Sequence, residues 1–273
     1  MGTNSAVAEH YGRDRPIDRI RDQLTSAGLD LDELEPSDLS GVDEFHLGGK
    51  LATIELLASA GLSESSHVLD VGCGIGGAAR TVATLAGCKV TGVDLTPVFI
   101  DTARELSAMV GVAERVEFAV GDATALEFPD ATFDAITMVH VGMNIAAKST
   151  LFAELARVLR PGGTLHVYDI MRTGDGDLTF PLPWATDAST SFVASADEYV
   201  AAIRAVGLVP SAPLDRISLV TRALEASAET PPVVNLAHLM GPEWPAMFSN
   251  LRAMLAQGVL TPIEIVAARS VER

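Results

Sequence analysis

The sequence has few cysteines and few cationic side chains, and each shortage excludes a class of protein. Its two cysteines, Cys73 and Cys88, are too few for a disulfide framework. Both fall within expected buried elements, where a small apolar role is favoured. Lysine and arginine number 19 against 36 aspartates and glutamates, a formal net charge of -17. Because nucleic-acid binding needs a basic face, no nucleic-acid partner is expected.

Long apolar runs are missing as well. No stretch approaches the length needed to cross a bilayer, so no membrane association is expected. The start, MGTNSAVAEHYGRDRP, lacks the charged and apolar regions of a signal peptide. These features predict a cytoplasmic protein. The hydrophobic share of 48% is enough for a substantial core, and 273 residues favour one large domain or one domain with additions.

Short apolar runs alternate with helical patterns from His67 onward. The runs HVLDVG, KVTGVDL, VEFAVGDA, FDAITMVH and TLHVYDIM predict buried strands. Between them, GAARTVATLAG, TPVFIDTARELSAMVG and KSTLFAELARVLRPGG predict helices, the second with Thr96 as N-cap and the third ended by Pro-Gly-Gly. This alternation predicts an α/β fold with a parallel sheet wound by right-handed crossovers.

Further helical patterns flank this region. Residues 15–27 and FHLGGKLATIELLASAGL have apolar residues at helical spacing, DEYVAAIRAVGL predicts a helix, and LTPIEIVAARS predicts a final strand. The segment after the fifth strand, TFPLPWATDASTSF, is too long for a simple connection, and long connections are often lids or binding loops. The expected division is an N-terminal helical arm at 1–45 and a Rossmann-like domain at 46–273, with lid segments at about 172–195 and 220–258.

The stretch DVGCGIGG has two interpretations. Gly72, Gly74 and Gly77 spell the dinucleotide fingerprint G-x-G-x-x-G, whereas Gly72, Gly74 and Gly76 spell G-x-G-x-G with an acid two residues upstream. A glycine-rich turn that opens a helix lets a ligand approach the backbone, and the helix N-terminus favours a pyrophosphate. Asp70 disfavours pyrophosphate and suits a sulfonium cofactor with an α-amino group. Capping of loop N–H groups is its alternative role.

Asp94 and Asp122 lie at the carboxyl ends of the next two predicted strands, as Asp70 does at the end of the first. A carboxylate about 20 residues past the glycines holds ribose hydroxyls in both cofactor classes, so Asp94 supports nucleotide binding without choosing the nucleotide. Asp122, in GDA, can accept a hydrogen bond from an adenine amine, and a generic turn is the alternative. With Asp70, these acids lie at the ligand edge of an open α/β sheet.

Five segments resemble, in order and spacing, the class I (Rossmann-like) S-adenosylmethionine-dependent methyltransferases: VLDVGCGIGG, VTGVDLTPVFIDTAR, VEFAVGDATALEF, FDAITMVHV and ELARVLRPGGTLHVYDI. The resemblance covers roughly residues 45–208 and is strongest to small-molecule methyltransferases of the sarcosine/dimethylglycine and natural-product type. It implies a doubly wound, seven-stranded, mostly parallel sheet whose last strand is antiparallel. It also implies S-adenosyl-L-methionine as cofactor, S-adenosyl-L-homocysteine as product and a small-molecule substrate.

The resemblance, together with the strand ends, indicates which residues hold the cofactor. The expected contacts are Asp70, Gly72, Gly74, Asp94, Leu95, Asp122, Ala123, Val139, His46 and Gly48. The methyl group of a sulfonium is already activated, so the enzyme needs mainly to align a nucleophile and exclude water. No metal is expected.

Candidate catalytic and substrate-binding residues lie outside the glycine loop. His140 is the first candidate for a general base, with packing near the cofactor as the alternative. Tyr11, on the N-terminal arm, could reach its own active site or a neighbouring subunit's in a homo-oligomer, and a disordered arm is the alternative. Asn144 orients substrate or caps a helix. Trp184 and Phe192 form an aromatic wall over the substrate or pack the lid.

The sequence leaves more than one function open. The first is N- or O-methylation of a small molecule in secondary metabolism, with C-methylation of an electron-rich alkene or aromatic carbon, including a prenylated one, as the alternative. A nicotinamide-dependent oxidoreductase is disfavoured by Asp70 and GDA. A non-catalytic cofactor-binding protein is disfavoured by the complete set of nucleotide residues. Trp244, Met247, Phe248 and Met240 complete an apolar substrate pocket or belong to ordinary core.

Overall fold

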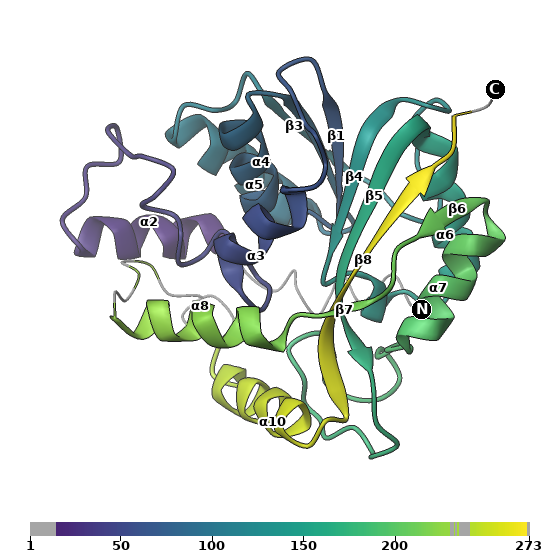
Figure 1. The fold of residues 1–273 in the computed structure, drawn as a ribbon. Coiled ribbons are helices and arrows are strands. Elements are labelled where there is room, and N and C mark those ends of the chain that lie inside the picture. The colour runs from purple at the N-terminus through teal and green to yellow at the C-terminus, as the bar shows by residue number, and fades with distance from the viewer. Residues whose placement is uncertain (1–14, 230–231, 233, 235–240, 272–273) are drawn as a thin grey trace.

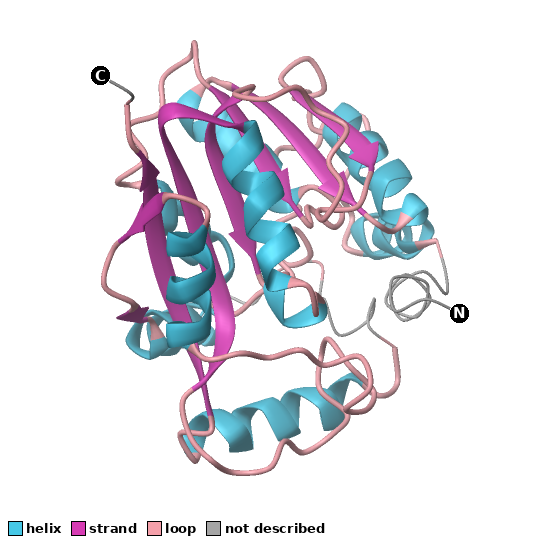
Figure 2. Ribbon diagram, turned by 90° about the vertical axis from the view of Figure 1, so that its right-hand side faces the viewer, coloured by secondary structure: helices cyan, strands magenta, loops and turns pink. Residues whose placement is uncertain are grey.

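The computed structural model describes residues 15–229, 232, 234 and 241–271. One sheet runs through the centre, and helices pack on both of its faces (Figures 1 and 2). The strand order is β3-β2-β1-β4-β5-β8-β6, and β7 pairs with β8 beside this path. The strands are β1 (His67–Val71), β2 (Lys89–Asp94), β3 (Val116–Val120), β4 (Phe133–Val139), β5 (Leu159–Arg172), β6 (Leu208–Pro210), β7 (Leu214–Asp215) and β8 (Leu260–Arg269).

The pairing confirms the predicted α/β class. Strands β1 to β5 pair in parallel, and β8 is antiparallel to β5, β6 and β7. The predicted final strand is therefore antiparallel, as expected. The sheet has eight strands among the described residues rather than the seven that the resemblance implies, because the segment after α7 forms two short strands, β6 and β7.

Helices occupy the connections between the strands. The α-helices are α2 (Pro16–Ser26), α3 (Gly49–Leu57), α4 (Gly77–Ala86), α5 (Pro97–Met109), α6 (Lys148–Val158), α7 (Ala196–Ala205), α8 (Ile217–Glu229) and α10 (Trp244–Ala256), and η1 (Gly142–Asn144) is a short 3-10 turn. None of the helices within the described ranges has the length and apolar character that a membrane span requires.

Alternate residues along the strands pack into two separate hydrophobic clusters. Val68 joins the cluster that includes Ala79 and Val82 of α4, whereas its neighbour Leu69 joins the cluster that includes Phe152 of α6. Because successive strand residues point to opposite faces, the two clusters lie on opposite sides of the sheet. Both cysteines are buried and unpaired, as their apolar environment predicts.

Two predicted helix ends are wrong in position. The second N-terminal helix begins at Gly49 rather than near Phe45, because Gly48 has a φ of 89°, outside the helical region. The helix before the fifth strand ends at Val158, and β5 already begins at Leu159, before Pro-Gly-Gly.

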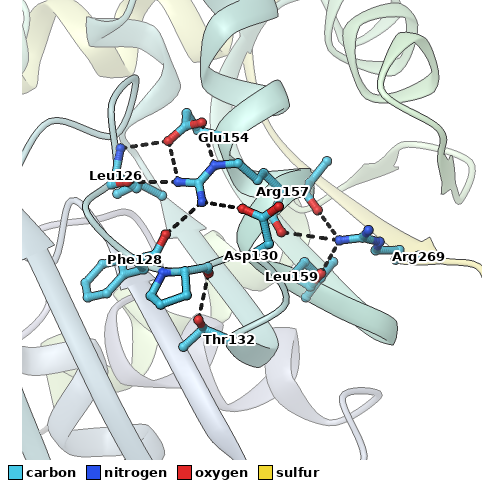
Figure 3. Close-up of polar contacts among 10 residues, drawn as sticks. Leu126, Phe128, Asp130, Thr132, Glu154, Arg157, Leu159 and Arg269 are labelled. Carbon is cyan, nitrogen blue, oxygen red and sulfur yellow. Dashed lines mark hydrogen bonds and ion pairs between the residues drawn. The ribbon is translucent and has the colours of Figure 1, made fainter.

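Arg157 explains where α6 ends. Its guanidinium bonds to Glu154 within the helix at 2.8 Å and donates to the carbonyls of Leu126 and Phe128 at 2.8 and 2.7 Å (Figure 3). Arg269 of β8 donates to the carbonyl of Leu159. These contacts tie the last turn of α6 to the loop before β4 and to β8, which commits the chain to a strand earlier than the Pro-Gly-Gly signal.

Two other sequence predictions need only small changes. Thr96 is at the N-cap of α5, but its side chain makes no capping bond, and its backbone N–H donates to Asp94. In α2, Ile17, Ile20 and Leu24 are buried, as their spacing predicts. The division of the chain at residue 45 stays a prediction.

Helix α10 lies at the carboxyl end of the parallel strands. Strand β8 follows α10 and runs antiparallel to β5, with Leu260 opposite Arg172, so β8 starts where β5 ends. Figure 1 shows α8 and α10 together at this end, below α3. The predicted lid region therefore lies at the ligand edge of the sheet.

Candidate active site

A cavity of about 1050 Å³ opens at the carboxyl ends of β1, β2, β3 and β4. One part of its wall comes from these strand ends and the glycine loop. Most of the rest comes from residues within 37–51, from η1, from residues 183–184 and from α8 and α10. The lining includes most of the residues predicted from the sequence: His46, Gly48, Asp70, Gly72, Gly74, Asp94, Leu95, Asp122, Ala123, Val139, His140, Asn144 and Trp184.

Asp70 is a buried carboxyl at the end of β1. Its Oδ1 accepts a hydrogen bond from Thr137 Oγ1 at 2.8 Å, and its Oδ2 has no partner among the described residues. Burial raises the pKa of Asp70 to about 7, and the nearby carboxylates of Glu44 and Asp94 add to this. A cationic group in the cavity would stabilise the ionised form, so this residue fits the α-amino group of the predicted cofactor.

The glycine loop lies open to the cavity. Gly72 and Gly74 have φ values of 68° and 52°, a region that favours glycine. A Cβ at Gly72 would lie 2.3 Å from Val141 Cγ2, whereas a Cβ at Gly74 would meet nothing within 4 Å. Gly72 therefore serves close packing, and the space beside Gly74 is free for a ligand that approaches the backbone.

Asp94 connects the glycine loop to the next helix. Its Oδ2 accepts from the backbone N–H of Gly74 at 3.0 Å, and its Oδ1 accepts from that of Thr96 at 2.8 Å. Burial raises its pKa. Asp122 has a comparable local role, because its Oδ1 accepts from the backbone and hydroxyl of Thr124 at 2.8 and 2.7 Å. Both carboxylates thus shape turns as well as line the cavity.

Gly77, the third glycine of the fingerprint, serves a contact with the N-terminal region. A Cβ there would lie 1.7 Å from the carbonyl oxygen of Asp43. Residues 43–46, here called the strap, pass directly over the start of α4. The fully buried Arg80 binds Asp43 and donates to the carbonyl of Ile75 at 2.8 Å. The strap is therefore fixed against α4 by a close backbone approach and by a buried ion pair.

The strap carries a carboxylate–histidine pair to the cavity. Glu44 Oε2 lies 2.7 Å from His46 Nε2 and accepts from Thr53 Oγ1 at 3.0 Å, while Oε1 accepts from Thr81 Oγ1 at 3.0 Å. Burial alone would raise the pKa of Glu44, but these bonds and His46 outweigh it and hold the pKa below its ordinary value. Glu44 is therefore a buried anion that orients His46.

His140 lies where β4 ends. Its φ of 55° is uncommon for a residue other than glycine, and its N–H donates to the carbonyl of Tyr168 at 2.8 Å. The ring lies 5.1 Å from that of Tyr168 and 5.7 Å from that of His46, between centroids. Burial, and then His46, lower the pKa of His140 well below its usual value. Its Nε2 is buried with no partner among the described residues.

The predicted substrate residues are only partly brought together. Asn144 and Trp184 line the cavity, and Asn144 Oδ1 lacks a partner in the described part of the chain. Phe192 is not part of the described wall. Its N–H donates to the carbonyl of Met143 at 2.7 Å, and its own carbonyl accepts from Lys148 Nζ at 2.8 Å. Tyr11 and Met240 lie outside the described residues.

Several wall residues were not singled out from the sequence. Glu44 lines the cavity and was missed, although the acids of DEFHLGG just before His46 were a usable signal. Arg80, which is buried behind the wall, was missed as well. From α10, Trp244 and Phe248 line the cavity, while Met247 is buried core. The rings of Trp244 and Phe248 stack with their centroids 5.6 Å apart. This helix thus contributes both to the cavity wall and to the core, and a role in binding substrate stays a prediction.

Comparison with known proteins decides the family of the central region. Residues 69–167 match a family model described as a methyltransferase domain. The chain contains a methyltransferase domain. The match spans β1 to β5 and includes the glycine loop, Asp94 and His140. It agrees with the methyltransferase resemblance found in the sequence, and the cofactor is taken up as a proposal below.

Relatives of this methyltransferase domain cover the chain to different extents. Sterol 24-C-methyltransferase of Eremothecium gossypii is 36% identical over 122 residues, which are 45% of this chain and 33% of that protein. The chain therefore spans about a third of this curated relative's length. Geranyl diphosphate C-methyltransferase of Streptomyces coelicolor, solved with Mg2+, geranyl-S-thiolodiphosphate and S-adenosyl-L-homocysteine, has a TM-score of 0.70, 19% identity and 98% coverage of both chains.

A third similar protein separates fold from reaction. The [4+2]-cyclase SpnF has a TM-score of 0.64 and 21% identity, and the similarity covers 93% of this chain and 94% of SpnF. At such identities the likeness shows the fold alone. The methyltransferase domain therefore sets the framework of the site, and the reaction must be argued from the site's own residues.

Proposed function

We propose that this protein transfers the methyl group of S-adenosylmethionine to a small-molecule acceptor. One observation supports this most: the glycine loop and its carboxylates line the same cavity as a set of apolar side chains, and His140 lines that cavity as well. Methyl transfer needs a cofactor and an acceptor in one enclosed space with their reacting atoms in line.

Residues around the glycine loop would hold the cofactor. S-adenosylmethionine supplies an activated methyl group on a sulfonium. Asp70 would bind the α-amino group, Gly72 and Gly74 the methionine part, and Asp94 the ribose. The adenine would lie near Leu95, Asp122, Ala123 and Val139. His46 of the strap, and Gly48 just after it, would close over the cofactor. Glu44 orients His46, and Arg80 holds the strap through Asp43.

The protein's own work is alignment, exclusion of water and removal of a proton. A methyl group replaces one hydrogen of the acceptor, and the released proton passes to a base. The lowered pKa of His140 keeps its imidazole unprotonated near neutral pH, so its unpartnered Nε2 can accept a proton or a hydrogen bond. Asn144, with an unpartnered Oδ1, would orient the acceptor.

The acceptor atom is nitrogen or oxygen in the first form of this proposal, and carbon in the second. The apolar part of the cavity favours methylation at carbon. Its aromatic residues Trp184, Trp244 and Phe248 would stabilise positive charge that develops on a hydrocarbon. Action in secondary metabolism, a cytoplasmic location and a homo-oligomer joined by the N-terminal arm, with Tyr11 reaching the site, are further proposals from the sequence.

Thermal unfolding with different ligands tests the proposal. A ligand present at 100 times its dissociation constant stabilises the folded state by about 2.7 kcal/mol, which raises the midpoint by roughly 5 °C or more for a chain of this size. S-adenosylhomocysteine should give such a shift and NAD should not. A shift with NAD alone would contradict the proposal.

His140→Ala tests the proton step separately. If His140 accepts the proton, turnover with an identified acceptor should fall by roughly 100-fold or more, while S-adenosylhomocysteine affinity stays within about twofold. Normal turnover would leave His140 with a packing role.

A further inference from the structure

The part of the cavity wall formed by described residues from Val139 onward is uncharged. Among the described residues, no lining residue after Thr124 is an aspartate, glutamate, lysine or arginine. This section of the wall, here called the chamber, consists mainly of apolar side chains, and its polar members are His140, Asn144 and Ser227. His140 is itself neutral near pH 7, because burial lowers its pKa.

Part of the chamber wall belongs to a packed core, whereas most of its α8 residues, such as Leu224, are exposed. Met143, Trp184 and Leu251 line it and are also members of one buried apolar cluster. The one polar atom of the Trp184 ring is already satisfied, since its Nε1 donates to Ser191 Oγ at 3.1 Å. The chamber therefore offers fixed apolar surface and few hydrogen-bonding groups.

The rest of the described lining is strongly acidic. The described lining before Val139 contains six carboxylate residues, Asp38, Asp43, Glu44, Asp70, Asp94 and Asp122, against one lysine, Lys50. Lys50 faces Asp43, whose ionised form it favours. A phosphate group in this cavity would lie either among acidic side chains or against apolar ones, and both environments are unfavourable for it.

We infer that the methyl acceptor is an uncharged, apolar molecule that carries no phosphate or diphosphate group. This inference rests on the proposed function and specifies its substrate class. It separates this chain from the geranyl diphosphate C-methyltransferase of the same fold, which was solved with a diphosphate analogue and Mg2+. A neutral terpenoid or another hydrocarbon-rich alcohol or alkene meets the requirement.

The two tryptophans make the inference measurable. Trp184 and Trp244 both line the chamber and are the only tryptophans in the chain. Their fluorescence therefore reports directly on a molecule that enters it. Full-length protein is first saturated with S-adenosylhomocysteine, and that binding is measured separately by calorimetry. Geraniol and farnesol are then titrated, and so are geranyl and farnesyl diphosphate with Mg2+, which share their hydrocarbon chains.

The expected result is saturable binding of at least one alcohol, at least tenfold tighter than its diphosphate. Equal or tighter binding of the diphosphates would overturn the inference, and so would no binding of either alcohol. In both cases the proposed function stands as long as S-adenosylhomocysteine binds. If S-adenosylhomocysteine itself fails to bind, the proposed function is wrong.

A charge placed in the wall provides the matched test. Leu224, on α8, lines the cavity and is 46% exposed, so Leu224→Lys adds a cation with little cost to folding. In this variant, the ratio of the dissociation constant of the diphosphate to that of the alcohol should fall at least threefold. Leu85 on α4 is also exposed, at 58%, and is not in the wall, so Leu85→Lys adds the same charge and should leave the ratio unchanged. Equal effects of both variants would contradict the inference.

Discussion

The two parts of the cavity are built in opposite ways. The cofactor part consists of strand ends and one glycine loop, and it is rich in carboxylates such as Asp70 and Asp94. The chamber consists of side chains from η1, α8 and α10, and its described wall is uncharged. The first part is rigid backbone that suits a ligand shared across a family. The second is made of side chains from helices outside the strand–loop framework, and a fold leaves such residues free to set specificity.

The largest expected effect concerns the anchor of the cofactor part. Arg80→Met removes the cation that pairs with buried Asp43 and leaves that carboxylate without its partner. Breaking a buried ion pair on one side costs about 3–5 kcal/mol, measured as the free energy of unfolding in urea. Arg222, in an exposed pair with Glu55, is the control, and Arg222→Met should cost less than about 1 kcal/mol. Equal losses would show that the buried pair is not an anchor.

The next effect comes from the contact between the strap and α4. Gly77→Ala introduces a Cβ 1.7 Å from the carbonyl oxygen of Asp43, so the strap must move. We expect a loss of about 1–3 kcal/mol in the free energy of unfolding and weaker S-adenosylhomocysteine binding. At Gly121 a Cβ would meet only ordinary contacts at 3.8 Å, so the stability of Gly121→Ala should be close to that of the original protein.

Asp70 should make stability depend on pH. Its folded-state pKa of about 7 lies above the ordinary value of 3.8, so between these pH values the folded state holds a proton that the unfolded state has lost. The free energy of unfolding of the ligand-free protein therefore falls as pH rises from about 4 to 7. Asp169, with a pKa raised to about 6 by burial, acts in the same direction.

Comparison with Asp70→Asn isolates this contribution. Its hydrogen bond from Thr137 can persist, so the variant should fold and show a smaller fall in stability over that pH range. Identical pH profiles of urea unfolding for the two proteins would show that the pKa of Asp70 is not raised in the folded protein.

The smallest expected effect on stability lies in the chamber. Phe248 is half-buried on α10, and Phe248→Ala removes wall surface without opening the main core. The KM for an identified acceptor, or the dissociation constant of geraniol, should rise about threefold to tenfold. S-adenosylhomocysteine affinity should stay the same. A loss of both affinities would mean that the two parts of the cavity do not act separately.

The sequence predicted where Asp70 and the glycines lie because this part of the cavity is local. A strand, a glycine turn and a helix follow one another within residues 67–86, so Asp70 and the glycines must lie at the ligand edge of the sheet. Asp94 and Asp122 end neighbouring parallel strands and reach the same edge for the same reason.

The remaining features depend on contacts between distant segments. Glu44 meets Thr81 across 37 residues, and Arg216 meets Glu55 across 161, so no local pattern reports either pair. The aromatic character of Phe192 suggested a wall residue, but only its backbone contacts Met143 and Lys148 in the loop network. Which side of α10 faces the cavity was likewise set by how that helix packs on β8.

Calorimetric titration of S-adenosylhomocysteine into three proteins tests the division of the cavity most directly: the unmodified chain, Asp70→Asn and Phe248→Ala. The account predicts one binding site per chain. Loss of the charged contact in Asp70→Asn should weaken affinity by about tenfold or more, and Phe248→Ala should bind as tightly as the unmodified chain. Absent binding, unchanged affinity in Asp70→Asn, or an equal loss in both variants would contradict it.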